Sequence, residues 1–147
     1  DTVAFTVRTF KDLPQPQRWL AGPRKKIEMG KTLPGVLVVH KHDGEPARGV
    51  FLETLSPLSS RSVSFAEFPL QGAAVEQALL EALKRQGLSE AESGALLATF
   101  RREFFEQRGV RIVSILPQWI YDAILPLRVA PRPSEVVRVG LVVTECE

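Results

Sequence analysis

The chain has 147 residues, of which 44% are hydrophobic and 24% charged, and its net charge at pH 7 is +2. This composition is typical of an ordinary globular domain and excludes an intrinsically disordered chain. No apolar run approaches the roughly 18 residues of a membrane-spanning helix. A single cysteine, Cys146, excludes an internal disulfide and a thiolate metal cluster. We therefore expect one domain over residues 1–147, stabilised by its apolar core.

The N-terminal quarter begins with an alternating pattern. Val3, Phe5 and Val7 recur every second residue, which predicts a half-buried strand over residues 1–9. Residues 10–35 are rich in Pro and Gly, so we expect them to wrap around the domain without a regular element. Residues 1–35 carry seven Lys/Arg and three Asp/Glu, so electrostatic steering of a partner is expected from this quarter.

A hairpin is predicted next. Two apolar runs, 36–42 and 48–55, flank Asp43-Gly44, a pair that supplies the positive φ angles of a tight reversal. Residues 61–66 alternate less strictly, and we expect them to form a third member of the same sheet.

Two helices follow in the middle of the chain. Apolar residues recur at helical intervals over residues 73–86, and Gly87 is placed to end that helix. Ser89 and Glu92 match a capping box, which predicts a second helix to about residue 107. Its expected apolar stripe consists of Leu97, Phe100 and Phe104. The short connection between the two predicts an antiparallel αα-hairpin.

The C-terminal part returns to strands. Residues 110–116 have the composition of a buried strand, and Pro117 suits the first turn of a short helix over 118–124. Residues 135–145 predict a last strand with Val137, Val139, Leu141 and Val143 on one buried face. The complete order predicts an α+β fold: two layers, with a largely antiparallel sheet covered by an αα-hairpin plus one short helix.

The motif "HKHDGE" is the sharpest candidate for chemistry. His40 and His42 point to the same side of a strand, with Asp43 and Glu45 just beyond, so the four are plausible ligands for zinc or a similar ion. A complete site needs three or four ligands, and the chain has no further His. The alternative is the polar tip of a hairpin, so we expect no cofactor.

The N-terminal quarter is the candidate for binding. Trp19 lies near Arg24, Lys25 and Lys26, a combination that serves phosphate contact and base stacking, or contact with acidic lipid or an acidic protein face. The overall charge near zero argues against nucleic acid. The strand containing Val3, Phe5 and Val7 is expected to complete its own sheet or that of a neighbour by strand addition.

A third candidate is the stretch "LPQWIYDAILPLRVAPRPSEVVRV", which we interpret as a folded corner rather than a binding site. Trp119 gives the short helix an apolar side, whereas Asp122 lies late in that helix, where a carboxylate is electrostatically unfavourable. Asp122 should therefore have a partner, and Arg128 and Arg138 are the two candidates.

The C-terminal half resembles a family of uncharacterised bacterial proteins of unknown function. The stretches that carry the resemblance are "EFFEQRGVRIVSILPQWIYDAILPLRV" and "PRPSEVVRVGLV", with a weaker "FPLQGA" before the helices. The resemblance implies a recurrent bacterial domain and implies no reaction. Residues 1–60 show no resemblance, and the terminal "TECE" departs from the family's ending.

These observations favour a non-enzymatic bacterial domain for protein binding or structural assembly. We expect its partners to be other protein subunits, including a homo-oligomer formed through the N-terminal strand. If Asp1 is a processed N-terminus, an exported location is favoured over a cytoplasmic one. The alternative, from a different class, is a small metal-dependent hydrolase that uses His40, His42 and Asp43.

Overall fold

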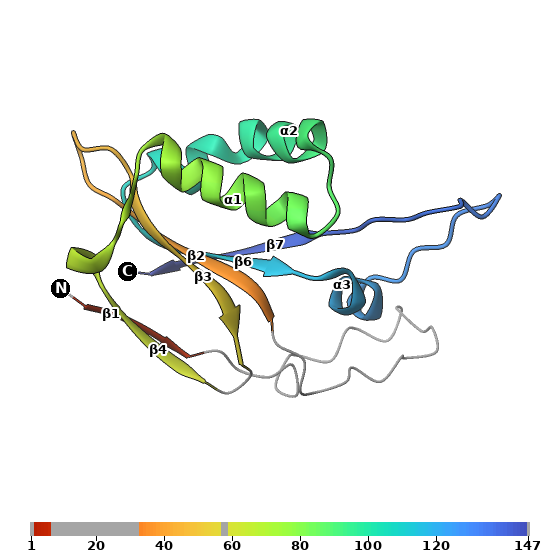
Figure 1. The fold of residues 1–147 in the computed structure, drawn as a ribbon, viewed down its shortest axis with the longest axis horizontal. Coiled ribbons are helices and arrows are strands. Elements are labelled where there is room, and N and C mark those ends of the chain that lie inside the picture. Colours follow the sequence, from red (N-terminus) through yellow and green to blue (C-terminus); the bar gives the residue numbers. More distant parts are fainter. Residues whose placement is uncertain (1, 7–32, 57–58, 147) are drawn as a thin grey trace.

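A computed structural model of the chain describes residues 2–6, 33–56 and 59–146. Its centre is a five-stranded antiparallel sheet with the strand order β5-β3-β2-β6-β7 (Figure 1). The strands of this sheet are β2 (Leu33–Lys41), β3 (Arg48–Leu55), β5 (Leu70–Gln71), β6 (Gly109–Leu116) and β7 (Gly140–Cys146). The predicted α+β fold with a largely antiparallel sheet is therefore confirmed.

Strands β2 and β3 form the predicted hairpin, and Gly44 occupies the turn with φ +77°. Strand β2 begins at Leu33, so residues 33–35, which we had assigned to the wrapping segment, belong to the sheet instead. The reason is the length of β3, the second strand of the hairpin: β3 ends at Leu55, and Leu33 is the residue of β2 that pairs with Leu55. Since β2 also pairs with β6, it is the central strand, and its residues 36–39 are buried.

The helices α1 (Ala73–Arg85) and α2 (Glu90–Arg101) cover one face of the sheet (Figure 1). Leu79 and Leu83 of α1 are fully buried against Leu37 and Val39 of β2. The connection has the predicted geometry: Gly87 ends α1 with φ +99°, and the amide of Leu88 donates to the carbonyl of Leu83 at 3.4 Å. The αα-hairpin is therefore confirmed.

The second helix ends in a π-helical turn, η3 (Arg102–Glu106), which shifts the face that meets the sheet. Phe104 and Phe105 are both buried there. Phe100, which we had placed in the apolar stripe, is 42% exposed and stacks on the Phe104 ring with the centroids 5.6 Å apart. A strict 3.6-residue period cannot anticipate this change, because the π turn inserts an extra residue.

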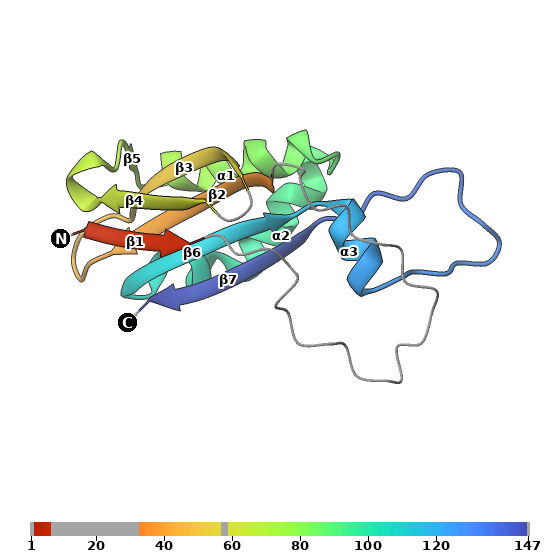
Figure 2. The same ribbon diagram turned by 90° about the horizontal axis from the view of Figure 1, so that it is seen from below.

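The opposite face of the sheet is covered by a separate two-stranded sheet of β1 (Thr2–Thr6) and β4 (Ser60–Ser64) (Figure 2). The expectation that residues 61–66 join the hairpin sheet is therefore wrong. The free edge of β3 pairs with β5 instead. Val63 of β4 is buried in a second core cluster with Val36, Val38 and Leu55, which explains why β4 lies across the sheet rather than beside it.

The last strand differs most from its prediction. Strand β7 begins at Gly140, five residues later than expected, and lies at the edge of the sheet. Val137 and Val143 of the expected buried face are each 39% exposed, and only Val139 and Leu141 pack against the helix-side core. The helices of the described chain contact mainly β3 and β2, so β7 at the edge of the sheet is covered only in part.

The short helix α3 (Gln118–Ile124) follows β6 as predicted. Residues 125–139, which we call the arm, leave α3, project beyond the sheet and helices, and return to β7 (Figures 1 and 2). Within the part of the chain that is described, no helix is long and apolar enough to cross a membrane.

Candidate functional site

The four residues considered as metal ligands lie at the tip of the β2–β3 hairpin, and the structure does not bring them around one point. The rings of His40 and His42 are edge to face with the centroids 6.4 Å apart. Asp43 pairs with Arg108 instead (Oδ2–Nη1 3.3 Å), and Glu45 is exposed. Within residues 2–6, 33–56 and 59–146, no group of three or more His, Cys, Asp or Glu could hold a metal ion.

His40 has an aromatic environment. Its ring stacks on Phe65 with the centroids 4.2 Å apart and an interplanar angle of 16°. Burial lowers the pKa of His40 below its usual 6.5, and the nearby His42 and Arg48 lower it further, whereas Glu45 opposes them. The neutral imidazole is therefore the form that the fold favours, and it stacks on Phe65, which packs against the second core cluster.

The binding residues expected in the N-terminal quarter are only partly described. Val3 and Phe5 lie on β1, which pairs with β4 of its own chain in the register Val3↔Val63 and Phe5↔Arg61. The other members of the candidate surface lie outside the described residues: Val7, Trp19, Arg24, Lys25 and Lys26.

The expected corner is organised by Arg138. Its Nη1 donates to Asp122 Oδ1 at 2.7 Å and to the carbonyl of Leu125 at 2.6 Å. Its guanidinium lies 4.4 Å from the centroid of the Tyr121 ring. Of the two candidate partners of Asp122, the structure thus selects Arg138. Trp119 is half-buried in the same short helix.

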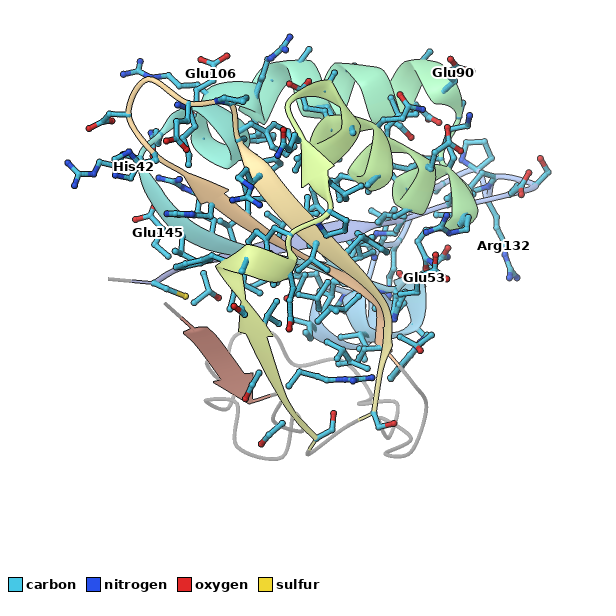
Figure 3. All side chains as sticks on the ribbon, turned by 60° about the vertical axis from the view of Figure 1, so that its left-hand side comes forward. His42, Glu53, Glu90, Glu106, Arg132 and Glu145 are labelled. Carbon is cyan, nitrogen blue, oxygen red and sulfur yellow. The ribbon has the colours of Figure 1, made fainter. Side chains whose placement is uncertain are left out.

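Gln118 holds the returning limb of the arm. Its Nε2 donates to the carbonyl of Val136 at 2.9 Å, and its Oε1 accepts from the backbone amide of Arg138 at 3.3 Å. The nitrogen and the oxygen of the Gln118 side-chain amide thereby make the hydrogen bonds that a neighbouring strand would make with residues 136–138. Helix α3 therefore fixes the two ends of the arm, Leu125 and Arg138, while the rest projects. Figure 3 shows Arg132 far out on this projection.

Exposed apolar side chains concentrate on the arm and on β7. Among the described residues, eight large hydrophobic side chains are exposed, and seven of them lie between positions 125 and 143. The seven are Leu125, Leu127, Val129, Val136, Val137, Val142 and Val143, with exposed fractions of 38–54%. Scattered exposed hydrophobic residues are normal in proteins, so the notable feature here is that seven of the eight fall within one stretch of the chain.

The two edges of the five-stranded sheet are built differently. Strand β5 has two residues, and α1 begins two residues later, so that edge offers little backbone for pairing. Strand β7 has seven residues, contains neither Lys nor Pro, and exposes Val142 and Val143. Short strands, Lys and Pro are the usual means by which proteins prevent pairing at an edge. Strand β5 is protected by its shortness, whereas β7 is long and carries a single charged residue, Glu145, near its C-terminal end.

A shallow groove of about 270 Å³ lies between α1 and α2, lined by Leu80, Leu97 and the small residues Gly94 and Ala98. At one end Arg101 Nη2 donates to Glu76 Oε1 at 2.8 Å. The two charged groups in the groove thus neutralise each other. The groove offers a shape but no catalytic arrangement.

Sequence reasoning missed the exposure of the arm and of β7. The pattern that could have revealed it is the alternation of Leu125, Leu127 and Val129 in a segment interrupted by Pro126. Such a segment cannot form a helix or a central strand, so its apolar side chains have no element through which to reach the core. The chain matches no protein-family model, and comparisons with curated proteins and with solved structures find no similar protein.

Proposed function

We propose that the chain is a non-enzymatic bacterial assembly domain that binds other protein through its arm and the edge of β7. The observation that carries this proposal is the concentration of exposed large apolar side chains on residues 125–143. A domain of this size can bury apolar side chains in its own core. Leaving these side chains exposed is therefore costly for the single chain and favours a binding partner that covers them.

The chemistry of the edge favours a polypeptide partner. One side of β7 is paired with β6 over all seven residues, and no strand of the described residues pairs with the backbone N–H and C=O groups of the other side. A row of alternating donors and acceptors at strand spacing is complementary to another strand, which is the basis of strand addition. Lipid or nucleic acid would leave this pattern unsatisfied.

Assembly through the N-terminal strand is less well supported. Strand β1 pairs with β4 over its whole length, Thr2↔Ser64 to Thr6↔Ser60, so its pairing capacity toward that side is used within the chain. We therefore place the binding surface at the C-terminal end of the sheet.

The test is site-specific photocrosslinking of the full chain in the cells that produce it. A benzophenone amino acid replaces Val129 on the arm or Val142 on β7, and in the matched control it replaces Phe100, which is similarly exposed on α2. We expect protein adducts from positions 129 and 142 and few from position 100. Equal yields at all three positions, or no adduct at 129 and 142, would refute the proposal.

A further inference from the structure

We infer that the partner of the β7 edge is β7 of a second copy of this chain. The two strands pair antiparallel about a two-fold axis, and the two five-stranded sheets become one sheet of ten strands. This inference rests on the proposed function and specifies the partner of the same surface. It follows from the symmetry, the side chains and the charge of β7.

Symmetry restricts the register to a few possibilities. If the two-fold axis is perpendicular to the sheet, both helical layers lie on the same side of the joined sheet. Residues opposite each other in an antiparallel pair point to the same face, so the axis must pass beside a residue and not between two residues. The midpoint of β7 (Gly140–Cys146) is Val143. Only an axis beside Val143 pairs all seven residues.

This register makes favourable side-chain pairs. Val143 lies opposite Val143 of the second copy, on the face toward the helices, because its partner in β6 is the buried Val113. On the other face each Val142 lies opposite a Thr144. Pairs of β-branched side chains stabilise antiparallel strands. Val142 and Val143, which are 46% and 39% exposed in the single chain, thus lie at the centre of the joined strands.

The charges of the edge permit this pairing. Glu145 is the one charged residue of β7, and Arg111 Nε lies 3.5 Å from its carboxylate. With the axis at Val143, the two copies of Glu145 are four residues apart along the strands, about 14 Å. This separation exceeds the Debye length of about 8 Å in physiological salt, so the carboxylates do not repel each other appreciably. Figure 3 shows Glu145 near the C-terminal end of β7, away from the centre of the strand.

Within the described part of the chain, no strand occupies the outer edge of β7, so a second copy can pair there. The described helices pack mainly against β3 and β2, and Leu141 is the residue of β7 that packs against the helix-side core. The arm leaves the sheet at the Gly140 end of β7 and projects along the strand direction (Figure 1). In a two-fold pair the arms therefore emerge at opposite ends of the joined strands.

The test is disulfide formation in the full chain with Cys146→Ser as the background. Val143→Cys places two thiols opposite each other at a Cα separation of about 4.5–5.5 Å, within the range of a disulfide. Glu145→Cys is the matched control on the same strand, where the thiols are about 14 Å apart. Phe100→Cys is the control for random collision. We expect the Val143→Cys chain to form covalent dimers at least about tenfold faster than either control.

The mass of the unmodified chain is measured in parallel by sedimentation equilibrium. We expect a concentration-dependent increase from 16.3 kDa toward twice that mass. Val143→Lys, which brings two ammonium groups together on the axis, should abolish the increase and leave the thermal unfolding temperature nearly unchanged. Equal disulfide rates for Val143→Cys and Glu145→Cys, or a monomer up to about 1 mM, overturn the inference.

The photocrosslinking experiment separates this inference from the proposed function. An adduct of position 142 with another copy supports both. An adduct with a different protein leaves the proposed function intact and overturns the pairing of two copies. No adduct overturns both.

Discussion

Arg138→Ala is the substitution with the sharpest expected effect on the base of the arm. The Arg138 side chain is 14% exposed and contacts Asp122, the carbonyl of Leu125 and the ring of Tyr121. Removing it takes away the side-chain contacts between residue 138 and the C-terminal end of α3, whereas the hydrogen bonds of Gln118 to the backbone of residues 136 and 138 remain. The arm should therefore loosen at its base before the sheet unfolds.

The magnitude follows from the three contacts. The ion pair contributes about 0.5–1 kcal/mol, because the Asp122 side chain is 41% exposed. The hydrogen bond to the Leu125 carbonyl contributes about 1 kcal/mol, and the cation–π contact about 0.5–1 kcal/mol. Since one side chain makes all three, the contributions are not additive, and we expect a loss of about 2 kcal/mol. For a chain of this length that lowers the unfolding temperature by about 4–8 °C.

The assay is denaturant unfolding together with hydrogen exchange of residues 118–139. The matched control is Arg132→Ala, which removes the same residue type from the exposed outer part of the arm and should change stability by less than about 0.5 kcal/mol. A double-mutant cycle with Asp122→Asn should give a coupling energy of about 0.5–1 kcal/mol. If Arg138→Ala and Arg132→Ala are indistinguishable in both measurements, α3 does not anchor the arm.

Three further predictions concern the helix-side core, the capping box of α2 and the stack of His40 on Phe65. Leu83→Ala, at a fully buried position of α1, should cost about 3 kcal/mol in urea unfolding, and a cost below 1 kcal/mol would contradict the assigned core. Ser89→Ala should cost about 1 kcal/mol. Hydrogen bonds from the Ser89 hydroxyl and amide lower the pKa of Glu92, so the capping box stabilises fully above pH 4.5 and is lost as the pH falls through the lowered pKa. The Ser89→Ala protein keeps the backbone amide donor and should show a smaller acid dependence. The pKa of His40, followed by NMR, should lie below 6.5 and rise toward 6.5 in Phe65→Ala. Because the folded pKa is lowered, the stabilisation from the stack is complete above pH 6.5 and weakens as the pH falls. An unchanged titration in Phe65→Ala would show that Phe65 does not bury the ring.

Local signals predicted most of the fold. Gly87 and the pair Ser89–Glu92 define the helix connection through backbone geometry and hydrogen bonds within four residues, so they do not depend on distant contacts. The hairpin turn at Asp43-Gly44 is local in the same way. The partner of Asp122 was reduced to two arginines by electrostatics alone, and the structure shows Arg138.

What sequence reasoning could not supply depends on the arrangement of distant segments. The pairing of β4 with β1 joins residues about 60 positions apart, and no pattern within residues 60–64 specifies it. The partial exposure of β7 depends on which strands the helices pack against: α1 contacts β2 and β3, and η3 contacts β2. The apolar alternation of β7 is the same whether a helix layer or another protein covers it.

The proposed surface is located where it can bind without weakening the core. Strand β6 carries the fully buried Val113 and the nearly buried Ile115, and it is paired on both sides, with β2 and with β7. Strand β7 adds only Leu141, with the preceding Val139, to the helix-side core. Substitutions at Val142 and Val143, which are 46% and 39% exposed, therefore remove less buried surface than a substitution at Val113, so a change in assembly at these positions is separable from unfolding by a parallel measurement of stability.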